Sequence, residues 1–411
     1  MTEPTARAAD GGIRTLLGAG NRDYRRLLLA TLASQTGDWA ISAALAFHIY
    51  RLTGSTLSTA IMLLISRLPD VVLGSVAGAL ADRWDRRRLL VAADLLLALG
   101  LLPLLLVRNP AQVWIVYCVA LWTGILSTLL APAQKALVPQ LVTESQLVRA
   151  NALLGQGGQI ARLLGAMLGG VAVSAGGLTT VVLIDVAGFL ISAALQSTLR
   201  TPRRPAPIAA RLSRQWVAGV HLAMGDAGVR LLVVYMMITG LGEGVFATLA
   251  APFVADVLGG GADAYGLFLS VQAVGGIVGG LAVAAHPGNA APRLLLGTAT
   301  ITFGVVDLAL FAYPLALPEL WPAFVLIVLA GGPAAAAMAG FTTLAQTVTA
   351  DDHRGRVFGL LGSAQATTAL MGTALAGVLG GWIGIVPTLC LHAGGLIAAG
   401  LLVLVNRGNF D

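Results

Sequence analysis

Charged residues are scarce in this chain. Only 11% of its 411 residues are charged, whereas 57% are hydrophobic, and a soluble protein carries about 25% charged residues. This composition excludes an ordinary soluble globular protein and indicates a chain surrounded mostly by lipid. The net charge of +6 could suggest nucleic-acid binding, but nearly all the arginines fall in short connections between apolar segments, which indicates membrane topology instead.

Other absences narrow the function. The two cysteines, Cys118 and Cys390, lie in apolar segments, so neither a disulfide framework nor a metal site is indicated. No G-x-x-x-x-G-K-[ST] loop for ATP occurs. The connections hold neither a metal-spaced His/Asp/Glu cluster nor a nucleophile beside a base. We therefore expect neither an enzyme nor a cofactor, and no metal site. The first 21 residues contain no apolar core, so they are not a signal peptide.

Apolar runs predict an all-α polytopic membrane protein with twelve transmembrane helices, each long enough to cross a hydrocarbon core of about 30 Å. The expected spans are 25–49, 56–81, 89–107, 112–131, 151–174, 178–199, 229–253, 265–285, 293–313, 321–343, 356–380 and 384–405.

Arginine placement predicts the orientation. Arginines cluster before the first span, after the second and after the sixth, whereas the opposite connections hold only Arg51 and Arg108. Positive charge marks the cytoplasmic side, so both termini are expected in the cytoplasm. Lys135 is the only lysine, and this excess of arginine suggests a GC-rich bacterial genome, so we expect a multi-pass protein of the bacterial inner membrane. The expected organisation is a cytoplasmic tail, a six-helix half, a proline- and arginine-rich linker, a second six-helix half and a short tail: 1–24, 25–200, 201–228, 229–405 and 406–411.

The two halves resemble each other. Gly37-Asp38 in the first span is echoed by Gly242-Glu243 in the seventh, and glycines of spans 2 and 5 have counterparts in spans 8 and 11. Several echoes in register, with a central linker, indicate a pseudo-symmetric repeat of two six-helix halves.

The densest charge in the chain joins spans 2 and 3, in the run Gly78–Arg88. Its spacing G-x-x-x-D-R-x-x-R-R is built from Gly78, Asp82, Arg83, Arg86 and Arg87. The run resembles the signature loop of the major facilitator superfamily, except that Asp85 stands where that family usually has glycine. Further segments are similar to the bacterial exporter branch with enterobactin exporters, macrolide efflux proteins and actinobacterial multidrug pumps: Gly37–Trp39, Pro132–Pro139, Ala150–Leu153 and Gly355–Gly359.

The resemblance covers about Tyr24 to Val405 and implies the major facilitator fold and export. Two features depart from it. The fourth span has no arginine where drug/proton antiporters carry one, and the fifth reads Gly165-Ala166-Met167-Leu168-Gly169, with Ala in place of the usual Pro. Proton exchange is therefore implied by the overall family resemblance more than by the motifs of the fourth and fifth spans.

Charges inside the spans mark candidate functional residues, because each costs at least about 2.5 kcal/mol at the bilayer centre. Helix rise places Asp38 and Arg67 at similar depths, with Asp70 one turn from Arg67, so we expect these three to form a network. Two interpretations stay open. The network is either a static ion pair between spans 1 and 2, or a site where Asp38 alternates between proton and substrate. Glu243, which has no cation in its own helix, is a second candidate for proton coupling.

The remaining candidates have expected roles in gating, substrate contact and packing. Asp94 is expected beside the Arg83–Arg88 loop, Arg162 is a possible partner of Asp185, and Asp307 is expected to be structural. In the resembling fold the loop after span 2 abuts the start of span 11, and glycines let spans 2 with 11 and 5 with 8 approach closely. The expected gating residues are Gly78, Asp82, Arg83, Arg86, Arg87, Asp94 and Arg356; the cavity residues Trp39, Trp122, Arg162 and Phe246; and the packing residues Gly165, Gly169 and Gly377.

These features favour a secondary active exporter of hydrophobic or amphipathic small molecules, such as drugs, antibiotics or siderophore-like compounds, driven by protons. The expected partners are the substrate and the bilayer, with no nucleic acid, and a monomer is expected. The alternatives are a lysophospholipid or lipid transporter, or an uptake symporter of the same fold. A receptor or scaffold is less well supported, because the loops are too short to dock much.

Overall fold

The structure is a computed structural model that describes residues 21–83, 85–143, 146–200, 226–285, 291–317, 319–349 and 354–406. Across those ranges the chain is almost entirely helical and contains no strand. The long apolar runs of the sequence form helices because no water is available inside a membrane to satisfy backbone groups in any other way. The prediction of an all-α polytopic protein is confirmed.

The N-terminal half holds five long α-helices, one of which is bent into two arms. They are α2 (Arg22–Thr53), α3 (Thr56–Arg83), α4 (Arg86–Leu101) with its short continuation η2 (Leu102–Leu106), η3 (Pro110–Gln112) followed by α5 (Val113–Leu141), and α6 (Leu147–Ser197).

The bend in α6 creates two spans from one helix. Its 51 residues would extend for about 76 Å as a straight helix, more than twice the hydrocarbon thickness. The helix is interrupted at Gly176, with φ −151° and ψ 18°, and at Gly177, with φ 69° and ψ −166°. A positive φ is easily adopted only by glycine, so this pair permits the turn. The two arms correspond to the expected spans 151–174 and 178–199.

The C-terminal half holds six long helices. They are α8 (Ala227–Pro252) with its π-helical continuation η5 (Phe253–Val257), α9 (Ala262–Ala285), α10 (Pro292–Ala312) with η6 (Tyr313–Leu315), α11 (Trp321–Thr347), α12 (Arg354–Trp382) and α13 (Ile385–Val405). The linker 201–228 predicted from sequence falls mostly outside the described residues.

Nine stretches of the described residues are long and apolar enough to cross a membrane, and the stretch Leu153–Ser197 contains both arms of α6. α2 and α12 are not among the nine. Both lie between the two halves, α2 reaching toward α8 and α9 and α12 packing on α3, where polar residues are tolerated better than against lipid. With the two arms of α6 counted separately, the described residues form twelve helical segments of membrane length.

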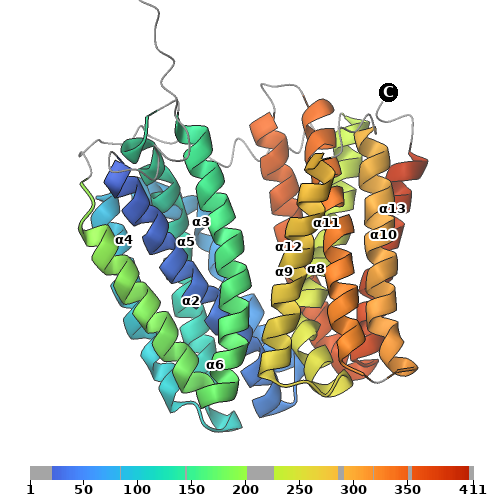
Figure 1. Ribbon diagram of the computed structural model, residues 1–411, viewed down its shortest axis with the longest axis horizontal. Helices are drawn as coiled ribbons and strands as arrows, with labels where there is room; N and C mark the ends of the chain where they lie inside the picture. Colours follow the sequence, from blue (N-terminus) through green and yellow to red (C-terminus); the bar gives the residue numbers. More distant parts are fainter. Residues whose placement is uncertain are drawn as a thin grey trace, which may run out of the picture.

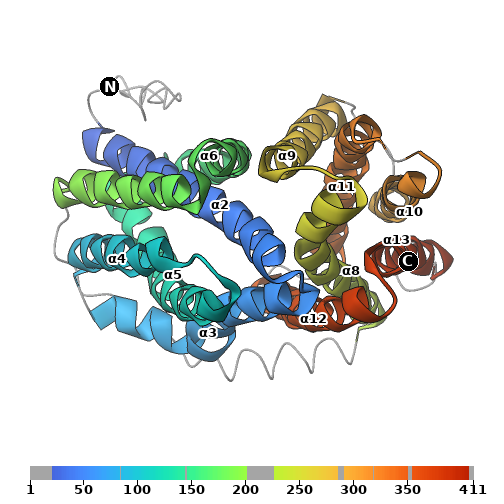
Figure 2. The same ribbon diagram turned by 90° about the horizontal axis from the view of Figure 1, so that it is seen from below.

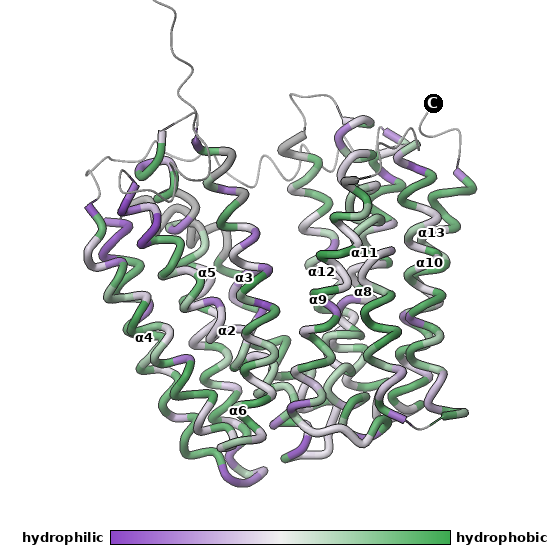
Figure 3. Tube along the Cα trace, in the orientation of Figure 1, coloured by the Kyte–Doolittle hydropathy of each residue, from purple (hydrophilic) through white to green (hydrophobic). Residues whose placement is uncertain are grey.

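The two halves form separate bundles that meet at one end (Figure 1). The start of α2 and the end of α13 lie at the opposite end, where the bundles diverge. Seen along the bundles, α3 lies beside α12 and α6 beside α9, one pair on each side of the interface (Figure 2). Hydrophilic residues gather at the ends of the helices, and a few lie at mid-depth (Figure 3). Those few define the candidate site.

Close helix approaches rest on glycine, although not always on the expected pairs. A Cβ added to Gly377 would lie 2.5 Å from Ala60 of α3, so the expected contact between spans 2 and 11 is present. Gly165 and Gly169 face α2, where an added Cβ would lie 2.5 Å from the Thr36 carbonyl oxygen and 2.4 Å from the Ala40 carbonyl oxygen, respectively. The prediction that Gly169 faces span 8 is wrong. The next residue, Gly170, is the one against α9.

Candidate functional site

Side chains from both halves close the end remote from the start of α2 and the end of α13. The Tyr50 hydroxyl donates to Asp256 Oδ2 at 2.5 Å, and the Phe47 and Tyr265 rings stack with centroids 5.9 Å apart. On the other side of the interface, Thr56 Oγ1 donates to the Gly377 carbonyl at 2.9 Å. We call the contacts of these residues the outer closure, after the orientation expected from the arginines. Because the described parts of the halves diverge at the opposite end, the space between them opens toward the start of α2 and the end of α13.

A cation of the N-terminal half lies where the halves begin to diverge. Arg162 of α6 donates to Gln272 Oε1 of α9 at 3.1 Å, and its guanidinium carbon lies 5.6 Å from the centroid of the Trp39 ring. A cation over an indole face is held by the quadrupole of the ring. The structure thus brings together two predicted cavity residues, Trp39 and Arg162. The expected pairing of Arg162 with Asp185 is wrong.

Glu243 of α8 reaches the same region from the C-terminal half. It accepts a hydrogen bond from Gln365 Nε2 of α12 at 3.0 Å and interacts electrostatically with Arg162. The sequence showed no cation in its own helix, and the structure supplies one from the other half. Opposite charges of the two halves therefore influence each other, although no ion pair joins them among the described residues.

Asp38 lies in a group of carboxylates inside the N-terminal half. It interacts electrostatically with Asp94 of α4 and Asp185 of α6. Asp185 is completely buried, and neither of its carboxylate oxygens has a hydrogen-bond partner within the described residues. A Cβ on Gly37 would lie 2.2 Å from Asp185 Oδ1, so only glycine at this position leaves room for that carboxylate. We call Asp38, Asp94 and Asp185 the carboxylate group.

The expected network of Asp38, Arg67 and Asp70 is wrong. Among the residues that the structure describes, no hydrogen bond or ion pair joins Arg67 to either aspartate. Asp70 instead accepts a hydrogen bond from Thr128 Oγ1 of α5 at 2.7 Å. Arg67 is exposed. Similar depth is not sufficient for contact, because rotation about the helix axis also decides which side chains meet.

The C-terminal half has a related arrangement that the sequence analysis missed. His392 Nε2 of α13 lies 3.3 Å from Asp307 Oδ2 of α10, and both side chains are buried. A Cβ on Gly242 would lie 2.2 Å from His392 Nδ1. Gly242 thus makes room for His392 as Gly37 does for Asp185. The expected structural role of Asp307 agrees with this pairing.

A sequence signal could have found His392. Gly177 and Gly384 both adopt positive φ, of 69° and 95°, at the turn before the last span of their half. Asp185 and His392 are each the eighth residue after that glycine. The repeat therefore places an acidic residue and an imidazole at equivalent positions in the two halves.

The loop after α3 is described in part. Asp85 caps α4 by accepting from the Arg88 backbone N–H at 3.0 Å, and Arg87 donates to the Ser197 carbonyl at the end of α6. Asp94 is buried and accepts a hydrogen bond from Gln196 Nε2 of α6 at 3.0 Å. Part of the arginine loop that it was expected to contact, including the Arg83 side chain, lies outside the described residues. The expected gating side chains of Asp82, Arg83 and Arg356, and the surroundings of Gly78, lie outside the described residues.

Two expected cavity residues lie elsewhere. Trp122 fits against Gly100 of α4 and donates from Nε1 to the Leu96 carbonyl at 3.0 Å. Its helix packs with α3 and α4 rather than with the other half, so it does not line the space between the halves. Phe246 packs in an aromatic cluster of the C-terminal half, 6.4 Å from Phe268, 6.3 Å from Phe311 and 6.4 Å from His392 between ring centroids. Packing against these rings is the role that the structure gives Phe246.

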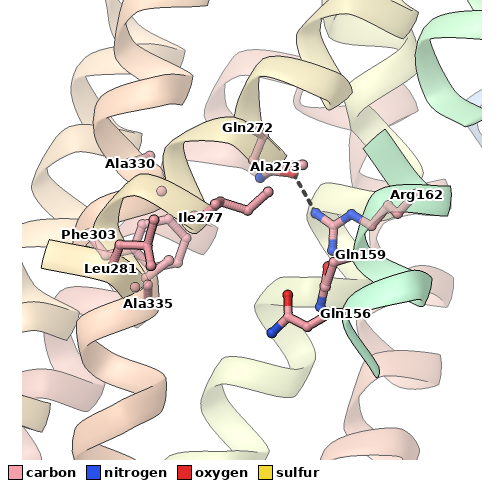
Figure 4. A pocket seen from close by; sticks show the side chains of 14 residues that line it. Gln156, Gln159, Arg162, Gln272, Ala273, Ile277, Leu281, Phe303, Ala330 and Ala335 are labelled. Atoms are coloured by element: carbon pink, nitrogen blue, oxygen red, sulfur yellow. Dashed lines mark hydrogen bonds between the residues drawn. The ribbon is translucent and has the colours of Figure 1, made fainter. Parts of the chain in front are cut away.

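A cavity of about 610 Å³ lies between the first arm of α6 and the helices α9, α10 and α11 (Figure 4). Arg162 and Gln272 stand at one edge, joined by their hydrogen bond, and Gln156 and Gln159 come from the same side of α6. Ile277, Leu281 and Phe303 lie across from them. Gln272 lines this cavity and also bonds Arg162 across the two halves. The cavity therefore adjoins the space between the halves, and we call it the side cavity.

Comparison with known proteins agrees with this architecture. A major facilitator family model, described as "Transmembrane secretion effector", matches residues 19–408. The chain belongs to the major facilitator superfamily. It is 26% identical to the enterobactin exporter EntS of Salmonella choleraesuis, over 94% of this chain and 92% of that one. It is 25% identical to macrolide efflux protein A of Streptococcus pyogenes, over 84% and 86%.

A solved structure shows the same fold. The crystal structure of a bacterial homologue of the iron transporter ferroportin, in an inward-facing state, aligns with a TM-score of 0.76 at 15% identity. The alignment covers 93% of this chain and 98% of that chain. At this identity the likeness concerns the fold alone. The exporter branch expected from the motifs is confirmed, and this chain is a multi-pass membrane protein of a transporter family.

Proposed function

We propose that this protein exports hydrophobic or amphipathic small molecules across the bacterial cytoplasmic membrane by alternating access, driven by protons that move inward. The observation that supports it most is that Arg162 and Glu243, which carry opposite charges, come from opposite halves and interact electrostatically. Charges at such depth are costly unless they serve a pathway. The export direction is favoured by the similarity to exporters.

The carboxylate group is the proposed proton site. Carboxylates that lie together in a low-dielectric interior repel one another when charged, and a proton removes that repulsion. Asp38 belongs both to this group and to α2, which carries Trp39 against Arg162. Proton binding at Asp38 is therefore in a position to change the packing of α2 and, through Trp39, the environment of the cation.

Asp38→Asn tests the coupling. Once a drug-sensitive host carrying the gene has identified an exported compound, everted membrane vesicles with an imposed pH gradient would measure its uptake. The amide mimics the protonated acid, so the variant should retain counterflow exchange and lose accumulation driven by the gradient. Asp23→Asn is a matched control, because Asp23 lies in the first turn of the same helix and pairs with Arg26 at 3.1 Å.

Two results would contradict the proposal. Near wild-type accumulation by Asp38→Asn would move the coupling role to Glu243. Export that continues in the presence of a protonophore, with ATP intact, would remove proton coupling altogether.

A lipid or lysophospholipid transporter is the second candidate. The side cavity favours it, because Leu281 on its rim is 66% exposed and lies on an apolar face of α9. A lipid transporter should move a fluorescent lysophospholipid between the leaflets of proteoliposomes, and a pump for soluble drugs should not. An uptake symporter of the same fold would accumulate its substrate inside intact cells.

A further inference from the structure

The side cavity exists because part of its wall is formed by residues with no side chain or only a methyl group. A Cβ on Gly276 would meet no atom within 4 Å, and one on Gly280 would meet only Ala335, at 4.0 Å. The facing part of α11 contributes only Ala330, Gly331, Ala334 and Ala335. The resulting volume of about 610 Å³ lies within the usual range for small-molecule sites, about 300–1,000 Å³.

One wall is rich in hydrogen-bond donors and carries a positive charge. Gln156, Gln159 and Arg162 are spaced three residues apart, so they follow one another along one face of α6, and Gln272 adds a fourth polar side chain from α9. Arg162 is the one charged residue in the lining, and no acidic residue of the described chain lines it. Glu243, which interacts with Arg162 electrostatically, is outside the lining and accepts a hydrogen bond from Gln365.

Arg162 has donors to spare. A guanidinium carries five N–H donors, and Gln272 is its one hydrogen-bond acceptor within the described residues. The other contact of Arg162 is with the face of the Trp39 ring. This contact is not a hydrogen bond and does not use an N–H donor. An arginine fork of this kind is suited to a carboxylate, sulfonate or phosphate group.

The opposite wall is apolar and leads outward. Phe303 and Ile277 line the cavity, and Leu281 continues along α9 one turn further. Ile277 is 40% exposed and Leu281 66% exposed, so much of this apolar wall is not covered by protein. A ligand with a polar head at Arg162 would lay an apolar body along this wall.

We propose that the side cavity binds an anionic amphiphile, with its anionic group at Arg162 and its apolar body on the wall formed by Ile277, Leu281 and Phe303. The inference rests on the proposed function in one respect: it takes this amphiphile to be the transported compound. The binding itself does not depend on proton coupling.

The test uses two probes of the same shape and opposite charge, tetraphenylborate and tetraphenylphosphonium. Equilibrium dialysis would measure their binding to the full chain in micelles of a neutral detergent, with empty micelles as the blank. Neither probe can accept a hydrogen bond, so the comparison isolates the charge of Arg162, and the wild type should prefer the anion by at least about tenfold. Arg162→Gln should abolish the preference while binding of the cation stays unchanged.

A second variant tests the cavity without touching its charge. Gly276→Leu places a side chain in open space, so the fold is retained, and it should weaken tetraphenylborate binding at least about tenfold by filling the cavity. Gly394→Leu is the matched control, since a Cβ there also meets no atom within 4 Å but lies on α13, away from the cavity. Equal binding of both probes by the wild type, or wild-type binding by Gly276→Leu, would overturn the proposal.

Competition identifies the source of the ligand. Displacement of tetraphenylborate by stoichiometric phosphatidylglycerol, but not by phosphatidylcholine, would support an anionic lipid as the natural ligand. Displacement only by soluble anionic amphiphiles such as dodecyl phosphate would support a dissolved compound. Failure of both to displace the probe would overturn the proposal. Intact anion binding in a protein whose transport ignores a protonophore would contradict the proposed proton coupling alone.

Discussion

Removal of one hydroxyl group from the outer closure should change which side of the protein is open. Tyr50 is 5% exposed, and its hydroxyl donates to the carboxylate of Asp256 in the other half at 2.5 Å. A hydrogen bond to a charged group contributes about 1.5–3 kcal/mol. The bond joins the two halves, so it exists only while this end is closed. Tyr50→Phe should therefore move the equilibrium toward the outward-open state by about 10- to 150-fold.

Distances between spin labels measure this shift. After replacement of Cys118 and Cys390, the free cysteines of the described chain, labels at the exposed positions Arg51 and Leu317 would report on the closed end. The longer-distance population should grow in Tyr50→Phe. Tyr265→Phe is the matched control, because it keeps the ring stacked on Phe47 and its hydroxyl has no hydrogen-bond partner in the described ranges. Identical distance distributions for wild type and Tyr50→Phe would refute the reasoning.

Two further predictions concern packing. Gly377→Leu should abolish transport but not membrane insertion, because a Cβ at this position would already lie 2.5 Å from Ala60. Transport assays would test this prediction, with the Gly394→Leu variant as the control. Normal transport by Gly377→Leu would refute it. His392→Ala should lower stability by about 3–5 kcal/mol, because it leaves the buried carboxylate of Asp307 without its partner. Thermal unfolding in detergent would measure the loss of stability. The double variant Asp307→Leu with His392→Leu should recover much of that stability. An unchanged unfolding temperature of His392→Ala would contradict the argument.

The helices and the two-half architecture were predictable because they follow from local properties of the chain. Apolar runs of about 20 residues must form helices in lipid, and the paired glycines Gly176 and Gly177 indicate the turn between two spans. The side-chain partners were less predictable. Counting along a helix gives depth, but neighbouring residues point about 100° apart, so a small error in rotation exchanges one partner for another.

Individual residues show this effect. Gly169 and Gly170 are adjacent, yet the first faces α2 and the second faces α9. Counting along the helices places Asp38 and Arg67 at similar depths, yet Asp38 interacts with Asp94 and Asp185. The pairing of Arg162 with Gln272 joins residues 110 positions apart, and that contact is set by how the halves approach, which no local pattern encodes.

The outer closure lies at one end of the molecule, so a small rotation of one half about that end moves the other end of its helices by a large distance. α2 contains 32 residues and therefore extends about 48 Å from its beginning to the closed end. A rotation of one half by only about 10° around that end would carry the far tip of such a helix roughly 8 Å sideways. Modest tilting is thus enough to bring α6 and α9 together over the side cavity. Such tilting leaves the Tyr50–Asp256 hydrogen bond in place. Access from the other side therefore needs a second step, in which the outer closure itself breaks.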